Sequence, residues 1–244
     1  MSSPVVFTNA QIIIGGYDLA AEYNAIELAE TATMLDANVF GDAAKRMKGG
    51  LKTFTVRGSG LYSSVEDPVL TTNLGLADVL LALFPTTVVD GTTKGYAYQC
   101  VEGLYNIGAR VGSLLPFSFQ TNPQGTALAR AISLKDFRST ALTTTANGTA
   151  FQLGALVAGQ TLYAGLHIFG AGTGAIDVTI QSDTASNFPS ATTQVTFAQQ
   201  AALNTTGVWA TPITSAITDD WWRASWTIAG GAPSFTGIVW MAIQ

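Results

Sequence analysis

The sequence contains little of the chemistry that enzymes commonly use. Its 244 residues include one histidine, His167, and one cysteine, Cys100. A lone cysteine excludes an internal disulfide and a cysteine metal cluster. A Ser-His-Asp triad needs a nucleophile beside the histidine, and the chain has no G-x-S-x-G elbow. We therefore expect no enzyme activity, no metal and no cofactor, and we expect His167 to be structural.

Charge is also scarce. Charged residues make up 11% of the chain, against about 25% in ordinary globular proteins. The net charge of −5 argues against general affinity for nucleic acid, which needs a basic surface. No apolar run reaches the ~18 residues that suggest a membrane-spanning helix, and the N-terminus lacks the regions of a signal peptide. These features predict synthesis in a cytosol without membrane insertion. They fit a surface covered by other subunits and, equally, a Thr/Ser-rich β protein.

The remaining charges divide the chain into two parts. Residues 1–138 hold ten of the eleven basic and twelve of the sixteen acidic residues, whereas residues 139–244 hold one and four. The change falls at a stretch of small polar residues that is typical of a linker. We therefore predict a first domain over 1–138, a linker over 139–148 and a second domain over 149–244.

The second domain has an almost purely β pattern. Short runs rich in Thr, Val, Ile and aromatic residues alternate with turn residues, which predicts an antiparallel β-sandwich of the Ig-like or jelly-roll-like kind. In one run, Trp222 and Trp226 share a face, and Trp221 and Arg223 share the other. We expect one face to be core. Trp221, Arg223 and Asp219 are a candidate glycan contact, so the alternative function is a carbohydrate-binding or adhesin-like protein.

The first domain combines strands with one short helix. Asp67 suits the N-cap of this helix, Pro68 its first position, and Gly75 its end. The following run, residues 78–84, predicts a buried strand. Residues 17–40 are ambiguous, because their Ala, Glu and Leu favour a helix but their spacing is poor for a single helical face.

A basic stretch, residues 45–57, holds five of the eleven basic residues. It lacks the interleaved aromatic residues of a nucleic-acid site and the following helix of a phosphate cradle. We interpret it as a subunit contact in which cations on one copy meet acids on the next. The candidate interface residues are Asp42, Lys45, Arg46, Lys48 and Lys52. The candidate acidic residues of the interface or a channel are Glu22, Glu27, Glu30 and Asp36.

Several short motifs occur in an order that resembles the major tail (tail tube) proteins of long-tailed bacteriophages. They are Leu35-Asp36, Phe40-Gly41-Asp42, the basic residues Lys45 to Lys48, Gly50-Leu51-Lys52, Asn73-Leu74-Gly75 and Leu115-Pro116-Phe117-Ser118. The resemblance covers about residues 1–138. Residues 150–244 resemble, more loosely, the variable outer domains that such proteins often carry.

The resemblance implies a β-sandwich or barrel with one short helix, in which residues 17–40 form strands. It implies stacked, six-membered rings around a channel for genomic DNA, with the basic stretch between rings and the second domain outside. Implied partners are further copies of the chain, a tape measure protein and a tail terminator, and a host-surface glycan is a candidate partner. The protein would belong to a virion tail assembled in the bacterial cytoplasm. Because a DNA channel should not bind its DNA, we predict a lumen with more Asp and Glu than Lys and Arg.

Overall fold

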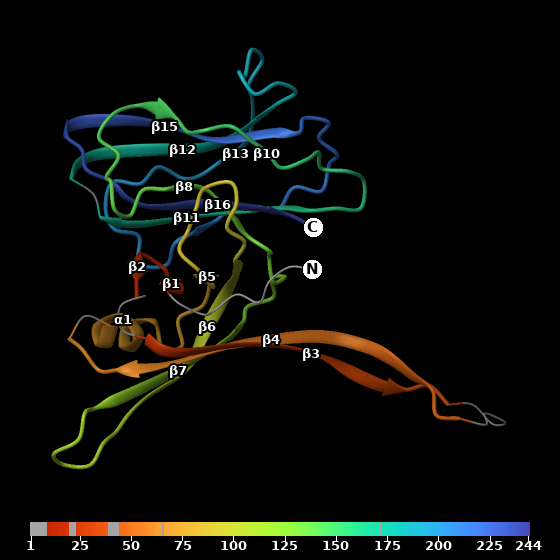
Figure 1. Ribbon diagram of the computed structural model, residues 1–244, viewed down its shortest axis with the longest axis vertical. Coiled ribbons are helices and arrows are strands. Elements are labelled where there is room, and N and C mark those ends of the chain that lie inside the picture. Colours follow the sequence, from red (N-terminus) through yellow and green to blue (C-terminus); the bar gives the residue numbers. More distant parts are fainter. Residues whose placement is uncertain (1–8, 20–22, 39–43, 65, 171) are drawn as a thin grey trace. The chain divides into compact units, whose positions relative to one another are not determined.

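The computed structural model describes residues 9–19, 23–38, 44–64, 66–170 and 172–244. Antiparallel β-strands dominate these residues, and α1 (Glu66–Asn73) is the one α-helix among them (Figure 1). The structure therefore confirms the prediction of a mostly β protein with one short helix. No helix in the described part of the chain is long and apolar enough to cross a membrane.

The chain forms two compact units, and each is built from separated stretches of sequence. The first unit comprises residues 1–21, 78–99 and 127–244, and the second comprises residues 22–77 and 100–126. Strand β6 (Tyr96–Ile107) is divided between them. The predicted linker, residues 139–148, lies inside the first unit. The predicted division into a tube domain, residues 1–138, and an outer domain, residues 149–244, is a division by function and stays a prediction.

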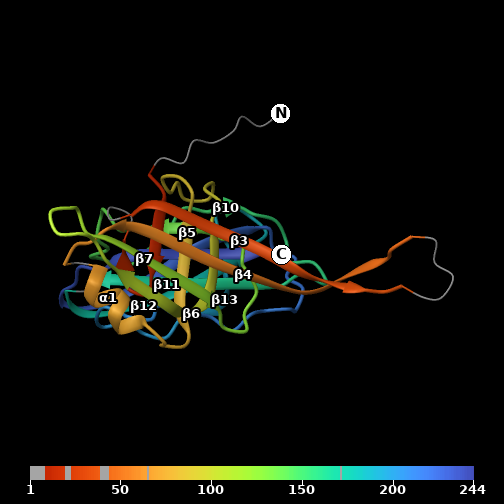
Figure 2. The same ribbon diagram turned by 90° about the horizontal axis from the view of Figure 1, so that it is seen from below.

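The second unit is built on a four-stranded antiparallel sheet. Its strands are β3 (Tyr23–Asp36), β4 (Met47–Leu61), β7 (Pro116–Pro123) and the later residues of β6, in the order β6-β7-β4-β3 (Figure 2). Strand β3 forms despite its helix-favouring composition because it pairs with β4 along its length, from Tyr23 opposite Gly60 to Asp36 opposite Met47. Tertiary pairing overrides local propensity here, and the strand expected from the resemblance is confirmed.

Helix α1 ends as predicted but begins differently. Gly75 follows it with a φ of 76°, a left-handed conformation that glycine adopts without steric cost. The helix begins at Glu66, so Asp67 lies in its first turn, and the predicted N-cap role of Asp67 is wrong. The Asp67 carboxylate instead accepts a hydrogen bond of 2.8 Å from the Tyr105 hydroxyl of β6. This bond ties the helix to the sheet.

The first unit contains a β-sandwich. One sheet has the order β10-β15-β12-β13, with β9 also on β15, and the other has the order β14-β11-β16-β8. The strands of the first sheet are β9 (Ala146–Asn147), β10 (Phe151–Gln152), β12 (Thr173–Asp183), β13 (Thr192–Thr196) and β15 (Trp221–Ala232). Those of the second are β8 (Ile132–Asp136), β11 (Leu162–Gly170), β14 (Val208–Trp209) and β16 (Thr236–Ile243).

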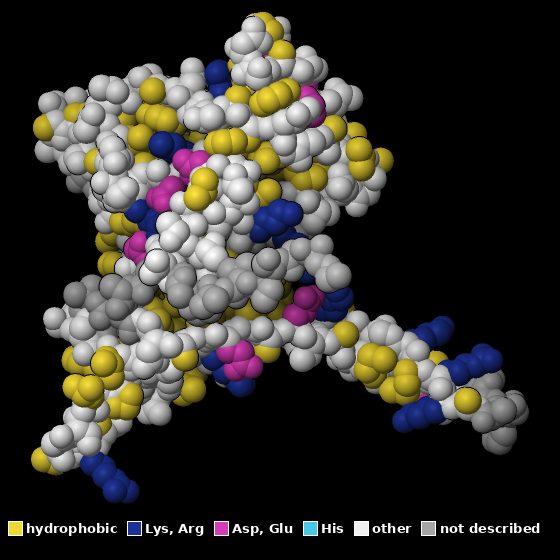
Figure 3. Space-filling view, viewed as in Figure 1, with side chains coloured by type: hydrophobic (Ala, Val, Ile, Leu, Met, Phe, Trp, Pro, Cys, Tyr) yellow, Lys and Arg dark blue, Asp and Glu magenta, His cyan; other side chains and the backbone are white. Residues whose placement is uncertain are grey.

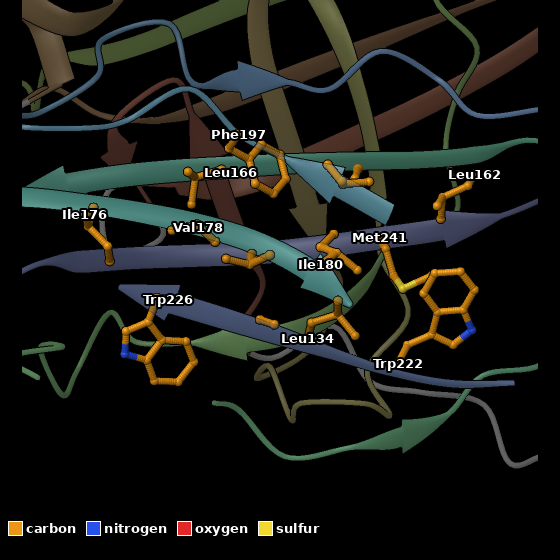
Figure 4. Close-up of a cluster of buried hydrophobic side chains, with 14 of the residues drawn as sticks. Leu134, Leu162, Leu166, Ile176, Val178, Ile180, Phe197, Trp222, Trp226 and Met241 are labelled. Atoms are coloured by element: carbon orange, nitrogen blue, oxygen red, sulfur yellow. The ribbon is translucent and has the colours of Figure 1, made fainter. Parts of the chain in front are cut away.

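The facing sides of these two sheets share one apolar core. Figure 4 shows Ile176, Val178 and Ile180 of β12 among side chains from the other sheet. Trp222 and Trp226 are 0% and 6% exposed, which confirms that their face of β15 is core. Trp222 also donates a hydrogen bond of 2.8 Å from its indole nitrogen to the carbonyl of Gly154, so its polar atom is satisfied inside the core.

The sheet of β11 and β16 is buried on both faces. Its second face packs, through Ile238 and Trp240, on β1 (Gln11–Ile14) and β5 (Val79–Phe84). Strand β1 pairs antiparallel with β5 and with β2 (Tyr17–Asp18). All six residues of β5 are buried, as the sequence predicts. Burial on both faces explains why β5 and β16 are continuous apolar runs instead of alternating ones.

Gly165 of β11 lies under the ring of Trp240, and we expect Gly165→Ala to destabilise the first unit. A Cβ at this position would lie 2.3 Å from Cζ2 of the fully buried indole. Overpacking of this kind costs about 1–3 kcal/mol. Urea unfolding followed by tryptophan fluorescence measures the change. Gly231→Ala is the matched control, because nothing lies within 4 Å of its added Cβ. Equal stability of the two variants would contradict this packing.

Candidate assembly surface

The β3–β4 hairpin extends well beyond its sheet. Strand β7 pairs with β4 only from Val56 to Leu61, so residues 47–55 of β4 are paired with β3 alone. This two-stranded part, which we call the ribbon, projects from the second unit in Figure 1. An isolated two-stranded hairpin is marginally stable in water, so a partner that covers the ribbon would stabilise it.

The ribbon carries apolar side chains that are left in solvent. Met34, Leu35 and Met47 are 57%, 52% and 42% exposed, and Leu51 is 87% exposed. Figure 3 shows hydrophobic side chains along the ribbon and dark blue basic side chains toward its far end. Grouped exposed apolar residues with a polar rim are typical of a protein interaction site.

The structure brings together two of the predicted acids and two of the basic residues within one copy of the chain. Lys52 Nζ lies 3.3 Å from Glu30 Oε1, and the two side chains are 72% and 39% exposed. Glu27 lies opposite Arg57 in the strand register, and Arg57 Nε donates a hydrogen bond of 2.8 Å to Gln120 Oε1. The ion pair of Lys52 with Glu30 links β4 to β3, and the hydrogen bond of Arg57 with Gln120 links β4 to β7. The sequence did not indicate this role.

The remaining predicted interface residues lie toward the end of the ribbon or outside the described residues. Lys45 and Lys48 are exposed and form no ion pair with any residue that the structure describes. Asp36 Oδ1 accepts the Asn38 amide at 3.0 Å, and Asn38 Oδ1 accepts the Arg46 amide at 2.6 Å. These bonds connect the two strands at the far end. Glu22 and Asp42 lie outside the described residues. An interface role for all these residues stays a prediction.

A second apolar surface, which sequence reasoning missed, lies on the β6–β7 hairpin. Ile107, Val111 and Leu114 are exposed there, with Val111 fully so at 107%. Tyr62, after β4, joins this hairpin through a hydrogen bond of 2.8 Å from its amide to the Leu115 carbonyl. The signal was present in the run VGSLLP, residues 111–116. Its three large apolar residues lie among Gly, Ser and Pro, which favour a turn over a core strand.

Strand β3 leaves one edge of the sheet open. Along its 14 residues it pairs with β4 on one side, and its other side has no strand partner among the described residues. Native proteins usually shorten, cover or bulge such an edge, because unpaired N–H and C=O groups recruit further strands. The long open edge of β3 is therefore a further candidate for pairing with a strand of another chain.

One face of this sheet is polar and nearly uncharged. It includes Ser59, Ser118 and Gln120, with Glu27 and Arg57 as one acid and one base. Gly58 points to the opposite face, where an added Cβ would lie 2.1 Å from the Phe119 ring. Phe119 thus packs against the glycine backbone. The polar face also carries one large apolar side chain, Leu104 of β6, which lies opposite Gln120 and is 48% exposed.

The second unit also buries a carboxyl group without a hydrogen bond. Glu102 of β6 is 1% exposed, and neither of its carboxyl oxygens has a hydrogen-bond partner. Burial raises its pKa to about 8. Burial, followed by the nearby Glu102 charge, also raises the pKa of the Cys100 thiol, which makes this thiol unreactive. No group of three or more potential metal ligands occurs among the residues that the structure describes.

His167 is buried in the first unit. Its Nδ1 donates a hydrogen bond of 2.6 Å to the carbonyl of Gly15, and its Nε2 has no partner. Burial lowers the pKa of His167 to about 4, the Gly15 carbonyl opposes this shift, and the charge of Arg138 adds to it. These contacts connect β11 to the β1–β2 turn, so the geometry is that of a structural residue.

The predicted glycan residues lie on and beside the outer face of the first sandwich sheet. Trp221 and Arg223 are half-buried and alternate with the core residue Trp222. Asp219 accepts a hydrogen bond of 2.7 Å from Ser182 Oγ. The structure therefore places Trp221 and Arg223 on one face, as predicted, and gives Asp219 a partner within the sheet.

Comparisons with known proteins give likenesses of structure only. No family model matches the chain, and no curated protein matches it. One similar solved structure is a chain of the virion of a native gene transfer agent particle, with 13% identity and a TM-score of 0.39 over 49% of this chain and 93% of that one. Another is the Dit protein of SPP1, described as a paradigm of the hub adsorption apparatus in phages that infect Gram-positive bacteria. It has 12% identity and a TM-score of 0.36 over 96% of this chain and 99% of that one.

Proposed function

We propose that the protein is a structural subunit of a bacteriophage tail tube. The observation that carries this proposal is the second unit: a four-stranded antiparallel sheet with an open edge at β3 and a projecting ribbon of exposed apolar and basic side chains. These features leave the isolated chain with surfaces that further copies would cover. The motif resemblance of residues 1–138 supports the same assignment, with residues 149–244 on the outside of the tube.

The open edge supports closure into a ring. A head-to-tail contact between the β3 edge of one copy and the end of β6 in the next copy, beyond its bridge from Glu102 to Leu74, is heterologous. Such a contact closes a ring when the rotation per copy divides a full turn. Six copies, the number implied by the resemblance, would give a barrel of 24 strands. With strands about 4.8 Å apart and tilted by about 40°, its backbone diameter would be about 45–50 Å. Closure would also remove the exposed edges.

The ribbon supports contacts between rings. Its exposed Met34, Leu35 and Leu51 supply apolar area, and Lys45, Arg46 and Lys48 supply charge that steers a neighbouring copy and sets the register. In this proposal genomic DNA passes along the polar sheet face without specific binding. A tape measure protein and a tail terminator are the further partners, and the tail is assembled in the host cytoplasm.

Negative-stain electron microscopy of the concentrated full-length protein tests assembly. We expect rings or hollow tubes for the wild type, and loss of stacking when Lys45, Arg46 and Lys48 are all changed to Glu. The control is Lys94→Glu, an exposed charge reversal in the first unit, which should leave the particles unchanged. Stacked tubes of the triple variant would overturn the ribbon contact. Monomers of the wild type at all concentrations and salt levels would count against the whole proposal.

A second candidate function is carbohydrate binding by the first unit. It is favoured by the outer sheet face, where the half-buried Trp221 and Arg223 lie two residues apart on one strand. A tail subunit with such a face would contact glycans of the host surface. This candidate is independent of whether the second unit forms rings.

A further inference from the structure

The guanidinium of Arg223 is held in a fixed orientation. Its Nε donates a hydrogen bond of 2.9 Å to Oε1 of Gln181, the residue directly opposite on β12. Its central carbon lies 4.2 Å from the centroid of the Phe188 ring. A guanidinium stacked on an aromatic ring and bonded at Nε still has its two terminal amino groups available for a planar, bidentate partner.

The loop that carries Phe188 is itself ordered by hydrogen bonds. Asp183, at the end of β12, accepts the Ala185 amide at 3.1 Å and the Ser190 amide at 2.7 Å, one with each carboxyl oxygen. Phe188 has a φ of 52° and is 7% exposed. A bulky residue in this left-handed conformation is strained. The hydrogen bonds of Asp183 hold the loop in this conformation, so the ring lies beneath Arg223 before any ligand arrives.

Arg223 has no ion pair with any residue in the described part of the chain. It is the one basic residue of positions 139–244. The neighbouring carboxylates already accept hydrogen bonds from other groups. Asp183 accepts them from the loop amides, Asp219 from Ser182 Oγ, and Asp220 from Gln152 Nε2 at 2.6 Å. Its terminal amino groups make no hydrogen bond to a described residue. Burial lowers the pKa of Arg223, and the nearby negative charge of Asp183 opposes this shift. No carboxylate in the described part of the chain forms a direct ion pair with Arg223, so its terminal amino groups can bind a planar external anion.

The surroundings of Arg223 favour an anion that belongs to a sugar chain. Trp221 lies two positions away on the same face, and aromatic rings of this kind stack on apolar faces of ligands. Thr179 and Ser225 form the next pair on that face, on the other side of Arg223. Asp183 lies opposite Trp221 on this face, with its carboxylate oxygens accepting the loop amides. The oriented cation, the indole and the small hydroxyl groups match a ligand with one acidic group and several hydroxyl groups.

We propose that Arg223, oriented by Gln181 and Phe188, anchors the carboxylate or phosphate group of an acidic glycan on the outer face of the β15–β12 sheet. This deepens the second candidate function and does not depend on tube assembly. A carboxylate would come from uronic acid units, and a phosphate from a polyol-phosphate chain. The two share the planar two-oxygen edge that a guanidinium fork recognises.

Isothermal titration of the full-length protein tests this with three probes: oligogalacturonate, its neutral methyl ester, and poly(glycerol phosphate). We expect binding of one or both acidic probes, affinity that falls with salt, and no binding of the methyl ester. Arg223→Lys keeps the charge but loses the fork, so its affinity should fall about tenfold. Arg223→Met should show no binding. Gln181→Ala, which releases the guanidinium, should weaken binding by a smaller factor.

The matched control is Arg130→Lys. Arg130 also stacks on an aromatic ring, with its central carbon 5.5 Å from the Tyr96 centroid, and its replacement should leave the affinity unchanged. Which acidic probe binds identifies the source of the anion. The proposal is overturned if none of the probes binds at millimolar concentration. Equal binding of the acidic and esterified probes, or unchanged affinity in Arg223→Met, would overturn it too. Tube formation is read separately by microscopy, so failure of one proposal does not imply failure of the other.

Discussion

Glu102→Gln is expected to stabilise the second unit at alkaline pH, by up to about 4–5 kcal/mol at pH 8. Burial raises the pKa of Glu102 from 4.5 to about 8, so the folded unit holds this proton more tightly than the unfolded chain does. The free energy of unfolding of the wild type should therefore fall by about 1.4 kcal/mol per unit as the pH rises from about 4.5 to 8. The variant mimics the neutral acid and should lack this slope.

Hydrogen exchange of residues 100–126 is the suitable measurement for Glu102, because all five tryptophans lie in the first unit. The wild type and the variant should show similar protection at pH 5 and diverge toward pH 8. Glu27→Gln is the control, since Glu27 is exposed on the polar face of the same sheet and its loss should change stability by less than about 1 kcal/mol. Protection of the wild type that is independent of pH, after correction for intrinsic exchange, would contradict the prediction.

The opposite pH dependence is expected of the first unit. Burial lowers the pKa of His167 from 6.5 to about 4, so the unfolded chain takes up the proton first as the pH falls. The stability of the first unit should therefore decrease between pH 6.5 and 4, by about 3 kcal/mol in total. His167→Asn keeps a side-chain N–H for the Gly15 carbonyl but does not titrate. Its stability should depend less on pH over this range.

Tryptophan fluorescence during urea unfolding at several pH values measures the His167 effect. Because Asn is smaller than His, the variant should be less stable at pH 7. The comparison therefore uses the slope of the free energy of unfolding against pH in each protein, and not its absolute value. The carboxylates of the chain titrate in both proteins and cancel in this comparison. Identical slopes would show that His167 is not held neutral in the fold.

Local sequence patterns predicted the first unit well. The alternation of Trp222 and Trp226 with Trp221 and Arg223 placed a core face and an outer face on one strand, and the apolar run of β5 predicted a buried strand. These inferences succeeded because each depends on burial alone, which residue type and periodicity report directly. Strand β3 is the opposite case, because its state is decided by pairing with β4.

The surface of the second unit was predicted only in part. The cationic residues were visible in the sequence, but the pairing of Lys52 with Glu30 depends on a register with irregularities between Tyr23 and Ala25 and between Ala32 and Met34. A shift of one residue reverses the faces of a strand, so such contacts cannot be counted from the sequence. The sequence did not predict the burial of Glu102 for a related reason. Nothing in the residues beside it shows that its face of β6 is covered.

The two units are interleaved along the chain, and this affects the order in which a newly made polypeptide can fold. All residues of the second unit have been synthesised once position 126 is reached. Strands β1 and β5, in contrast, pack on Ile238 and Trp240, near the end of the chain. At about 5–20 residues per second, translation of the remaining residues takes about 6–24 s. During that time the apolar residues of β1 and β5 lack their cover. Truncation of the chain before Ile238 should therefore destabilise the beginning of the first unit as well as its end.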